Sequence, residues 1–172
     1  MNSKSLKTVS AETTINASKD AVWNVWAQFN NVADYAASIP KSYTLGGKSS
    51  GLGASRRCDI SNKMQVDEMI TEWVPGERYS MEVIANKGVP VKTMEVCFMV
   101  AKIDHGMTSV SIEMKYRMKG LFHYLPVKGA MQQQARDHLM GLKHHVETGE
   151  IVSEKLLKAI RKRYSGDCRT LT

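Results

Sequence analysis

MTSVSIEMKYRM, residues 107–118, is the stretch of this 172-residue chain in which apolar and polar side chains alternate most regularly. Its apolar positions are Val110, Ile112, Met114, Tyr116 and Met118. Successive side chains of a strand point to opposite faces, so this pattern predicts a strand with one buried face and one wet face. A sheet made of such strands has an apolar face that another element must cover.

The residues before this strand divide into further strand-like runs. From residue 53 onward, the breaks fall at the turn-forming stretches 61–62, 75–76, 86–88 and 104–106. Residues 7–16 alternate as well, with Val9, Ala11, Thr13 and Ile15 on one side. The glycine-rich stretch 45–53 lacks the pattern of a phosphate-binding loop and is expected to be a connector. Antiparallel strands joined by short turns predict a meander.

Helical periodicity is found on either side of these strands. Beyond Pro126, apolar residues recur at helical spacing as far as a predicted end at Gly149: Val127, Met131, Ala135, Leu139, Leu142 and Val146. Near the N-terminus, Ser18 is expected to cap a short helix that contains Trp23 and Trp26 and extends toward Phe29. Asn30 and Asn31 are expected to interrupt this helix, and a second short helix is predicted over residues 32–38. Two short helices with so broad an apolar surface must lie on something large and hydrophobic.

Composition narrows the class of protein. The net charge is +7, and residues 150–172 contain six basic and three acidic side chains. No apolar run approaches the length of a membrane span, and the first sixteen residues lack the apolar core of a secretory signal. The three cysteines are widely spaced and contain no CxxC pair, so we expect reduced thiols in a cytoplasmic protein.

The order of these elements resembles the SRPBCC superfamily, which includes START domains, the birch-pollen-allergen fold and the polyketide cyclase/dehydrase and lipid-transport family. The resemblance rests on the order and spacing of "INASKDAVWNVWAQFNNVADYAASIP", "GLGASRR", "VDEMITEWVPGERYSMEV", "GMTSVSIEMKYRM" and "HLMGLKHHVETGE". It implies an α+β helix-grip fold, in which a twisted antiparallel sheet wraps around a long C-terminal helix and leaves a hydrophobic tunnel. Residues 1–150 would form this ligand-binding domain. The resemblance says nothing about residues 151–172, whose own pattern predicts a basic amphipathic C-terminal helix and tail with an apolar stripe of Ile151, Leu156, Leu157, Ile160 and Tyr164.

A polar pair is expected inside the predicted tunnel. A hairpin that turns near Asn62 would place Arg56 opposite Glu68. If both point inward, they form an anchor for a ligand carboxylate or hydroxyl group; if both point outward, they form a weak surface pair. A slip of one residue in the register decides between these two alternatives.

Other candidate residues carry weaker signals. His138 lies on or beside the apolar stripe of the long helix and His145 near the same face, but no zinc-binding spacing is present, so a satisfied or edge-exposed histidine is the favoured interpretation. Glu68, Tyr116 and His138 could form an acid–base set for an aldol-type cyclisation. The apolar connector 121–126 is either a lid at the tunnel mouth or ordinary packing against the end of the sheet.

The sequence therefore predicts a protein that binds a small or medium hydrophobic ligand, of lipid, polyketide or aromatic type. The first alternative is a polyketide cyclase or dehydratase that uses the same tunnel. The second is a membrane-associated interaction module that acts through the basic tail. We expect no metal, no nucleotide cofactor and no nucleic-acid partner. The residues expected to line the ligand are Phe29, Tyr35, Arg56, Glu68, Phe98, Met114, Tyr116, Met131, Ala135, His138 and Leu139.

Overall fold

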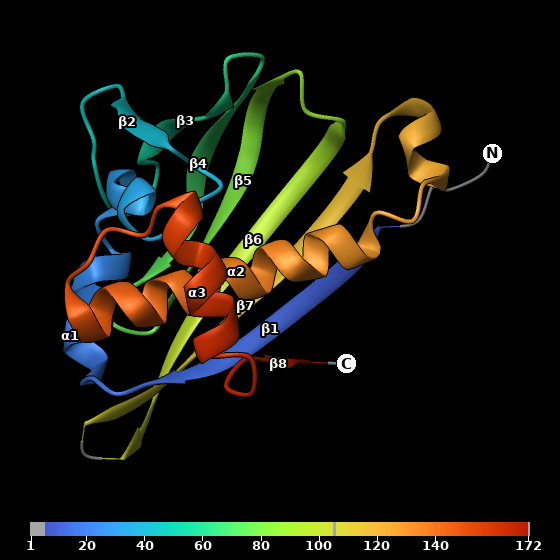
Figure 1. The fold of residues 1–172 in the computed structure, drawn as a ribbon. Coiled ribbons are helices and arrows are strands. Elements are labelled where there is room, and N and C mark those ends of the chain that lie inside the picture. The colour runs from blue at the N-terminus through green and yellow to red at the C-terminus, as the bar shows by residue number, and fades with distance from the viewer. Residues whose placement is uncertain (1–5, 105, 172) are drawn as a thin grey trace.

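The computed structural model describes residues 6–104 and 106–171 and contains one antiparallel sheet. Its strand order is β2-β3-β4-β5-β6-β7-β1-β8, so the meander from β2 to β7 is completed by β1 beside β7 (Figure 1). The strands are β1 (Lys7–Ile15), β2 (Lys41–Leu45), β3 (Ser55–Ser61), β4 (Met64–Val74), β5 (Arg78–Lys87), β6 (Val91–Asp104), β7 (Met107–Met118) and β8 (Arg169–Thr170). His105, in the predicted turn before β7, lies outside the described residues.

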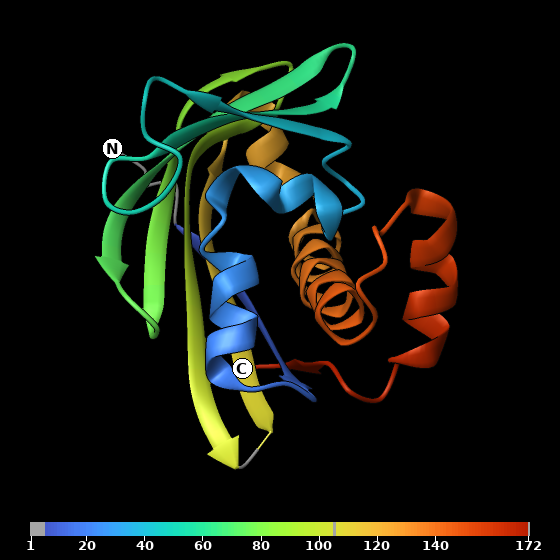
Figure 2. The same ribbon diagram turned by 90° about the vertical axis from the view of Figure 1, so that its left-hand side faces the viewer.

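The sheet bends around one long helix, α2 (Lys128–Thr148), which covers its inner face (Figure 2). At one end, α1 (Lys19–Trp26) and the 3₁₀ helix η1 (Phe29–Asp34) connect β1 to β2. The hydroxyl oxygen of Ser18 accepts a hydrogen bond from the amide of Ala21, as predicted for the cap of α1. α2 ends at Gly149 in the left-handed conformation, also as predicted. This arrangement is the α+β helix-grip fold.

The predicted inner face of β7 is confirmed, because all five of its apolar side chains are buried and the residues between them are half-buried. β1 repeats this pattern with Val9, Ala11, Thr13 and Ile15. These side chains pack against buried residues of α2, including Ala135, Leu139 and Leu142. The core therefore lies between the sheet and α2, where the ligand site was expected.

Two details of the helical and strand predictions were wrong. The second short helix does not span residues 32–38, because the 3₁₀ helix η1 already includes Asn30 and Asn31. The Asn31 amide donates to the Gln28 carbonyl at 2.9 Å, and its side chain binds the Gln28 side chain at 2.7 Å. The backbone of Asn31 (φ −91°, ψ 16°) is not helical, so the predicted interruption is found as a kink at this residue within η1. Strand β2 had no predicted element of its own; it pairs with β3 at the edge of the sheet.

The C-terminal extension packs on the helix-grip core. Helix α3 (Glu154–Arg163) lies on the side of α2 that faces away from the sheet, and β8 pairs with β1 (Figure 2). Val152, Ile160, Tyr164 and Cys168 are buried. Ile151, placed on the apolar stripe of this helix by the sequence, is instead exposed, because Ser153 caps α3 and the chain before it is extended. The neighbouring Val152 takes the buried position and donates its amide to the Asp34 carbonyl at 2.9 Å.

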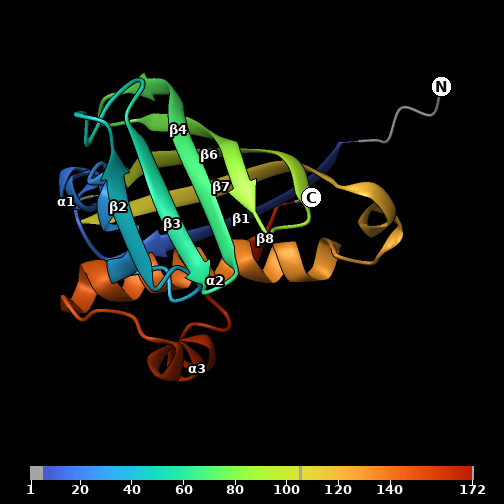
Figure 3. The ribbon, with the colours of Figure 1, turned by 90° about the horizontal axis from the view of Figure 1, so that it is seen from above.

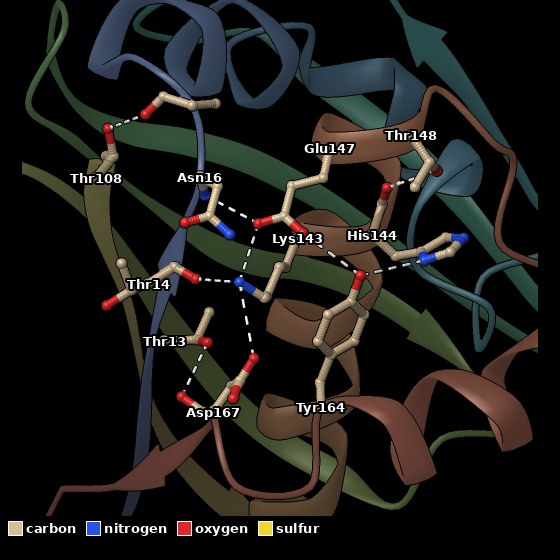
Figure 4. Close-up of polar contacts among 11 residues, drawn as sticks. Thr13, Thr14, Asn16, Thr108, Lys143, His144, Glu147, Thr148, Tyr164 and Asp167 are labelled. Atoms are coloured by element: carbon tan, nitrogen blue, oxygen red, sulfur yellow. Dashed lines mark hydrogen bonds and ion pairs between the residues drawn. The ribbon is translucent and has the colours of Figure 1, made fainter. Parts of the chain in front are cut away.

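A buried polar network fastens this extension to the core (Figure 4). The Lys143 ammonium donates to the Thr14 carbonyl at 2.6 Å and to Glu147 at 2.9 Å, and lies 3.8 Å from Asp167. The Glu147 carboxylate also accepts the Asn16 amide at 2.8 Å. Because Lys143 is surrounded by acceptors from three segments, its charge is compensated and it helps hold β1, α2 and the C-terminal segment together.

Candidate functional site

The sheet–helix interior contains a buried ion pair. Arg56 of β3 faces Glu68 of β4 in the ladder, and the Arg56 Nε and Glu68 Oε2 atoms are 2.7 Å apart. Both side chains are buried and face inward, so the inward orientation of the two that were predicted is the one found. The neighbouring pair Arg57–Asp67, one position along the same ladder, points outward and is partly exposed. A register slip of one residue would have placed Arg56 and Glu68 on that outer face.

The Arg56 guanidinium is occupied on every side. It also donates to the Phe29 carbonyl, its Cζ lies 4.0 Å from the centre of the Phe29 ring, and Nη2 is 3.6 Å from the Met81 sulfur. Burial disfavours the charged form, but the attraction of Glu68 outweighs it, so the pKa of Arg56 is raised and the side chain stays cationic. The pair therefore adds two compensated charges to the interior.

His138 enters the same interior from α2. Its ring lies edge-on to Tyr35 at 5.2 Å and beside Phe98 at 5.4 Å. Burial, with a smaller contribution from Arg56, lowers the pKa of His138 to about 3, so the imidazole is neutral at neutral pH. Its Nε2 atom is buried and has no hydrogen-bond partner among the described residues. The prediction of a satisfied or edge-exposed histidine was therefore wrong.

His145 does not join His138 in a metal site. Its ring lies 6.3 Å from that of Tyr35, and its Nδ1 atom is 2.8 Å from the Glu150 carbonyl oxygen. Among residues 6–104 and 106–171, no three metal-ligating side chains come together. The two histidines thus have separate environments.

Phe98 lies at the centre of an aromatic cluster. The rings of Trp26 and Tyr79 lie 5.1 Å and 4.7 Å from it, and Trp23 and Trp73 extend the cluster outward from Tyr79. The Trp26 indole nitrogen and the Tyr79 hydroxyl are buried without a hydrogen-bond partner in the described structure. Burial raises the pKa of Tyr79, so its hydroxyl stays protonated and can donate a hydrogen bond.

The remaining predicted residues lie on β7 and α2. Met114 and Tyr116 are buried on β7, Ala135 and Leu139 are buried on α2, and Met131 is half-buried one turn before Ala135. The Tyr116 hydroxyl is buried and unpartnered among the described residues, and burial raises its pKa. All eleven predicted residues are therefore buried or half-buried in the sheet–helix interior.

Several residues of this interior were not among those predicted to line the ligand. Trp26, Cys58, Tyr79 and Met81 are all buried beside the predicted set. The alternation of Tyr79 and Met81 along their strand was a usable signal, because it places both on one face. Cys58 lies 3.6 Å from Glu68, and burial raises the pKa of its thiol to about 12, so it is an unreactive neighbour of the ion pair.

Four hollows open on the surface, and none of their linings includes any of the eleven predicted residues. The largest of the four, about 530 Å³, is lined by polar groups of β1 and the C-terminal segment, with Lys143 at its inner wall. A second, about 490 Å³, is lined by Val9 and Ile112 of the inner face of the sheet, by Lys128 and Gln132 of α2, and by Thr170 and Leu171.

The family described as polyketide cyclase / dehydrase and lipid transport matches residues 7–147. The chain belongs to this family. Its members lie within the SRPBCC superfamily, as the sequence resemblance indicated. The matched range ends within α2, so α3 and β8 are additions that follow the family's common core. Among curated proteins, none matches this chain at a significant level.

Solved structures support the fold independently of sequence. TTHA0849 from Thermus thermophilus is 18% identical, with a TM-score of 0.70, and the match covers 83% of this chain and 99% of that one. Ara h 8.0201 is 14% identical, with a TM-score of 0.67 and coverage of 84% and 99%. An uncharacterised protein from Bacillus thuringiensis is 17% identical, with a TM-score of 0.67 and coverage of 83% and 99%. At these identities the likeness shows the helix-grip fold alone.

Proposed function

We propose that this protein binds a largely apolar, uncharged small molecule between its sheet and α2. The observation that carries the proposal is a set of four buried polar atoms without hydrogen-bond partners among the described residues: Trp26 Nε1, Tyr79 Oη, Tyr116 Oη and His138 Nε2. Most buried polar groups in proteins are paired, so four such atoms on one interior are unusual. A ligand with hydroxyl or carbonyl groups would supply their partners.

The charges of the interior favour an uncharged ligand. Glu68 already neutralises Arg56, and a ligand carboxylate would have to compete with it at 2.7 Å. His138 is neutral, so it adds no positive charge that would attract an anion. The expected ligand is therefore an apolar molecule with one or two hydroxyl or carbonyl groups, held by Trp26, Tyr79 or Tyr116 as donors and by His138.

The direct test is native mass spectrometry of freshly purified protein, followed by extraction and identification of any retained small molecule. A second measurement uses Nile red, an uncharged apolar probe, in fluorescence titrations. Ala135→Trp, at a fully buried position of α2, should weaken probe binding by about tenfold or more, whereas Ala130→Trp, at an exposed position of the same helix, should leave it unchanged. Equal probe binding by both folded variants would contradict the proposed site.

The family also includes cyclases and dehydrases, and the interior offers one group suited to such a reaction. The unpartnered Nε2 of His138 could accept a proton from a bound substrate. A pKa near 3 makes this imidazole a weak base at neutral pH, which favours binding over catalysis. With an identified ligand, His138→Ala should change affinity only modestly. Product formation that disappears in this variant while binding persists would establish the enzyme instead.

A further inference from the structure

One end of the molecule combines exposed apolar side chains with lysines. The 3₁₀ helix η2 (Gly120–Tyr124) follows β7 and leads into α2. Leu121, Phe122, Tyr124 and Leu125 are 82%, 48%, 75% and 47% exposed, respectively. Four large apolar side chains exposed within five residues mark an interaction surface. Their exposure disfavours the sequence-based alternative that this connector packs on the end of the sheet.

Three connections follow one another along this side of the molecule, with the β5–β6 connection between the β3–β4 turn and the β7–α2 connection (Figure 3). The Lys119 amide donates to the Pro90 carbonyl at 2.8 Å, and its ammonium binds Asn86 and the Val89 carbonyl, so the β5–β6 and β7–α2 connections are in contact. Gln65 pairs with Lys87, which places the β3–β4 turn beside the β5–β6 turn. We name residues 61–64, 86–92 and 119–128 together the β7–α2 end.

The β7–α2 end is strictly basic. It contains Lys63, Lys87, Lys92, Lys119 and Lys128, and no Asp or Glu occurs in residues 60–66, 83–94 or 114–136. Of the two carboxylates nearest to it along the β3–β4 hairpin, Asp67 is paired with Arg57, whereas Asp59 accepts a hydrogen bond from the uncharged Gln65 and keeps its charge; the five lysines outnumber it. A positive field therefore surrounds the apolar tip formed by η2 and Leu125.

We infer that the β7–α2 end docks on an anionic lipid bilayer. Leucine and aromatic side chains suit the boundary between headgroups and acyl chains, and lysines around them suit the negative headgroups. A second copy of this chain fits poorly, because five lysines would face five lysines. Nucleic-acid phosphates would pair with the lysines but would leave Leu121 and Leu125 exposed to water.

This surface also adjoins the interior site. η2 joins Met118, buried at the end of β7, to Val127 and Met131 at the start of α2. Docking would therefore bring the bilayer to the end at which η2 connects the sheet with the helix. The docking inference does not depend on the ligand proposal, because lysines and an exposed tip can bind vesicles whether or not the interior takes up a ligand.

The experiment is co-sedimentation of the full chain with phosphatidylcholine vesicles, with and without phosphatidylserine, at low and high salt. We expect binding only to the anionic vesicles, weakened by salt. Leu121→Ser/Phe122→Ser should reduce this binding about tenfold or more, and Lys87→Gln/Lys92→Gln/Lys128→Gln should do the same. The matched control, Lys155→Gln/Lys158→Gln/Lys162→Gln, removes the same charge from exposed positions of α3 and should retain binding.

The outcomes separate the alternatives. Loss of binding in the α3 variant, with retention in the β7–α2 variants, would assign the membrane contact to the basic tail and overturn the inference. Absence of wild-type binding to anionic vesicles would overturn it as well. The inference would also fail if RNA, at equal phosphate concentration, displaced the protein from the vesicles. Nile red binding by the two β7–α2 variants, measured without vesicles, reports on the interior site separately.

Discussion

Arg56 and Glu68 place two full charges in an interior that is otherwise lined with aromatic and aliphatic side chains. Removing a charge from water is costly, and only close pairing offsets that cost. Arg56 also donates a hydrogen bond to the Phe29 carbonyl and lies over the Phe29 ring, which adds to the compensation of its charge. At this scale the sequence predicted which residues oppose each other, because the turn near Asn62 sets the register. The unpartnered atoms of His138 and Tyr79 were not predictable, since they depend on what other elements place around them.

Removing one charge of this pair should be strongly destabilising. Glu68→Gln would leave Arg56 buried and uncompensated, and we expect a loss of about 3 kcal/mol in the free energy of unfolding, measured by urea denaturation. Arg56→Met/Glu68→Gln should recover part of this loss, because no uncompensated charge remains. Asp67→Asn is the matched control on the same ladder, and its effect should be much smaller because Arg57 is partly exposed. Equal losses for Glu68→Gln and Asp67→Asn would contradict this account.

His138 should make stability depend on pH. Its pKa is lowered from 6.5 to about 3, so between these values the unfolded chain binds a proton that the native state excludes. Stability due to this group is fully present above pH 6.5 and is lost as the pH falls toward 3, by roughly 3 to 5 kcal/mol in total. Unfolding of His138→Phe should therefore be less sensitive to acid than that of the wild type. Parallel stability curves for the two proteins between pH 7 and pH 4 would show that this histidine is not the cause.

At the scale of elements, the position of α2 depends on the close contact between Gly141 of this helix and Tyr35, the residue that follows η1. A Cβ atom at Gly141 would lie 2.0 Å from the Tyr35 carbonyl oxygen, so only glycine lets the helix lie this near. The sequence predicted the length of α2, because its apolar period runs unbroken to Gly149. It did not predict η1, since a 3₁₀ turn has too short a period to be distinguished from a loop. Strand β2 escaped prediction for a similar reason, because only five residues carry its pattern.

Gly141→Ala should destabilise the protein although alanine is the better helix former. The clash with Tyr35 would move α2 or η1, and we expect a loss of about 2 kcal/mol or more in the free energy of unfolding. Gly129→Ala, near the start of the same helix, meets no atom within 4 Å and should be neutral or slightly stabilising. Both are measured by thermal and urea denaturation. A stabilised Gly141→Ala variant would mean that α2 does not approach Tyr35 this closely.

For the whole molecule, the interior site and the C-terminal extension lie on opposite faces of α2. The inner face contributes Ala135, His138 and Leu139, whereas Lys143 and Asp137 bind partners in the extension. The sequence predicted a basic amphipathic helix here, but its periodicity placed Ile151 on the buried stripe and could not show that Val152 takes that place. Among the described residues, no helix has the length and apolar content needed to cross a membrane. The extension thus packs on the face of α2 that points away from the sheet, and it lies outside the residues matched by the family.

Truncation after Gly149 should lower the melting temperature clearly, because it removes the burial of Val152, Ile160, Tyr164 and Cys168 and separates Lys143 from Asp167. Burying such side chains is worth a few kcal/mol together, about 2 for each large aliphatic one. Two point variants test whether packing is the reason. Ile160→Ala, at a position only 1% exposed, should lower the melting temperature by several degrees, whereas Ile151→Ala, at a position 67% exposed, should leave it unchanged. If the truncated chain melts at the wild-type temperature, α3 does not stabilise the domain. If it also loses vesicle binding, the extension and not the β7–α2 end contacts the membrane.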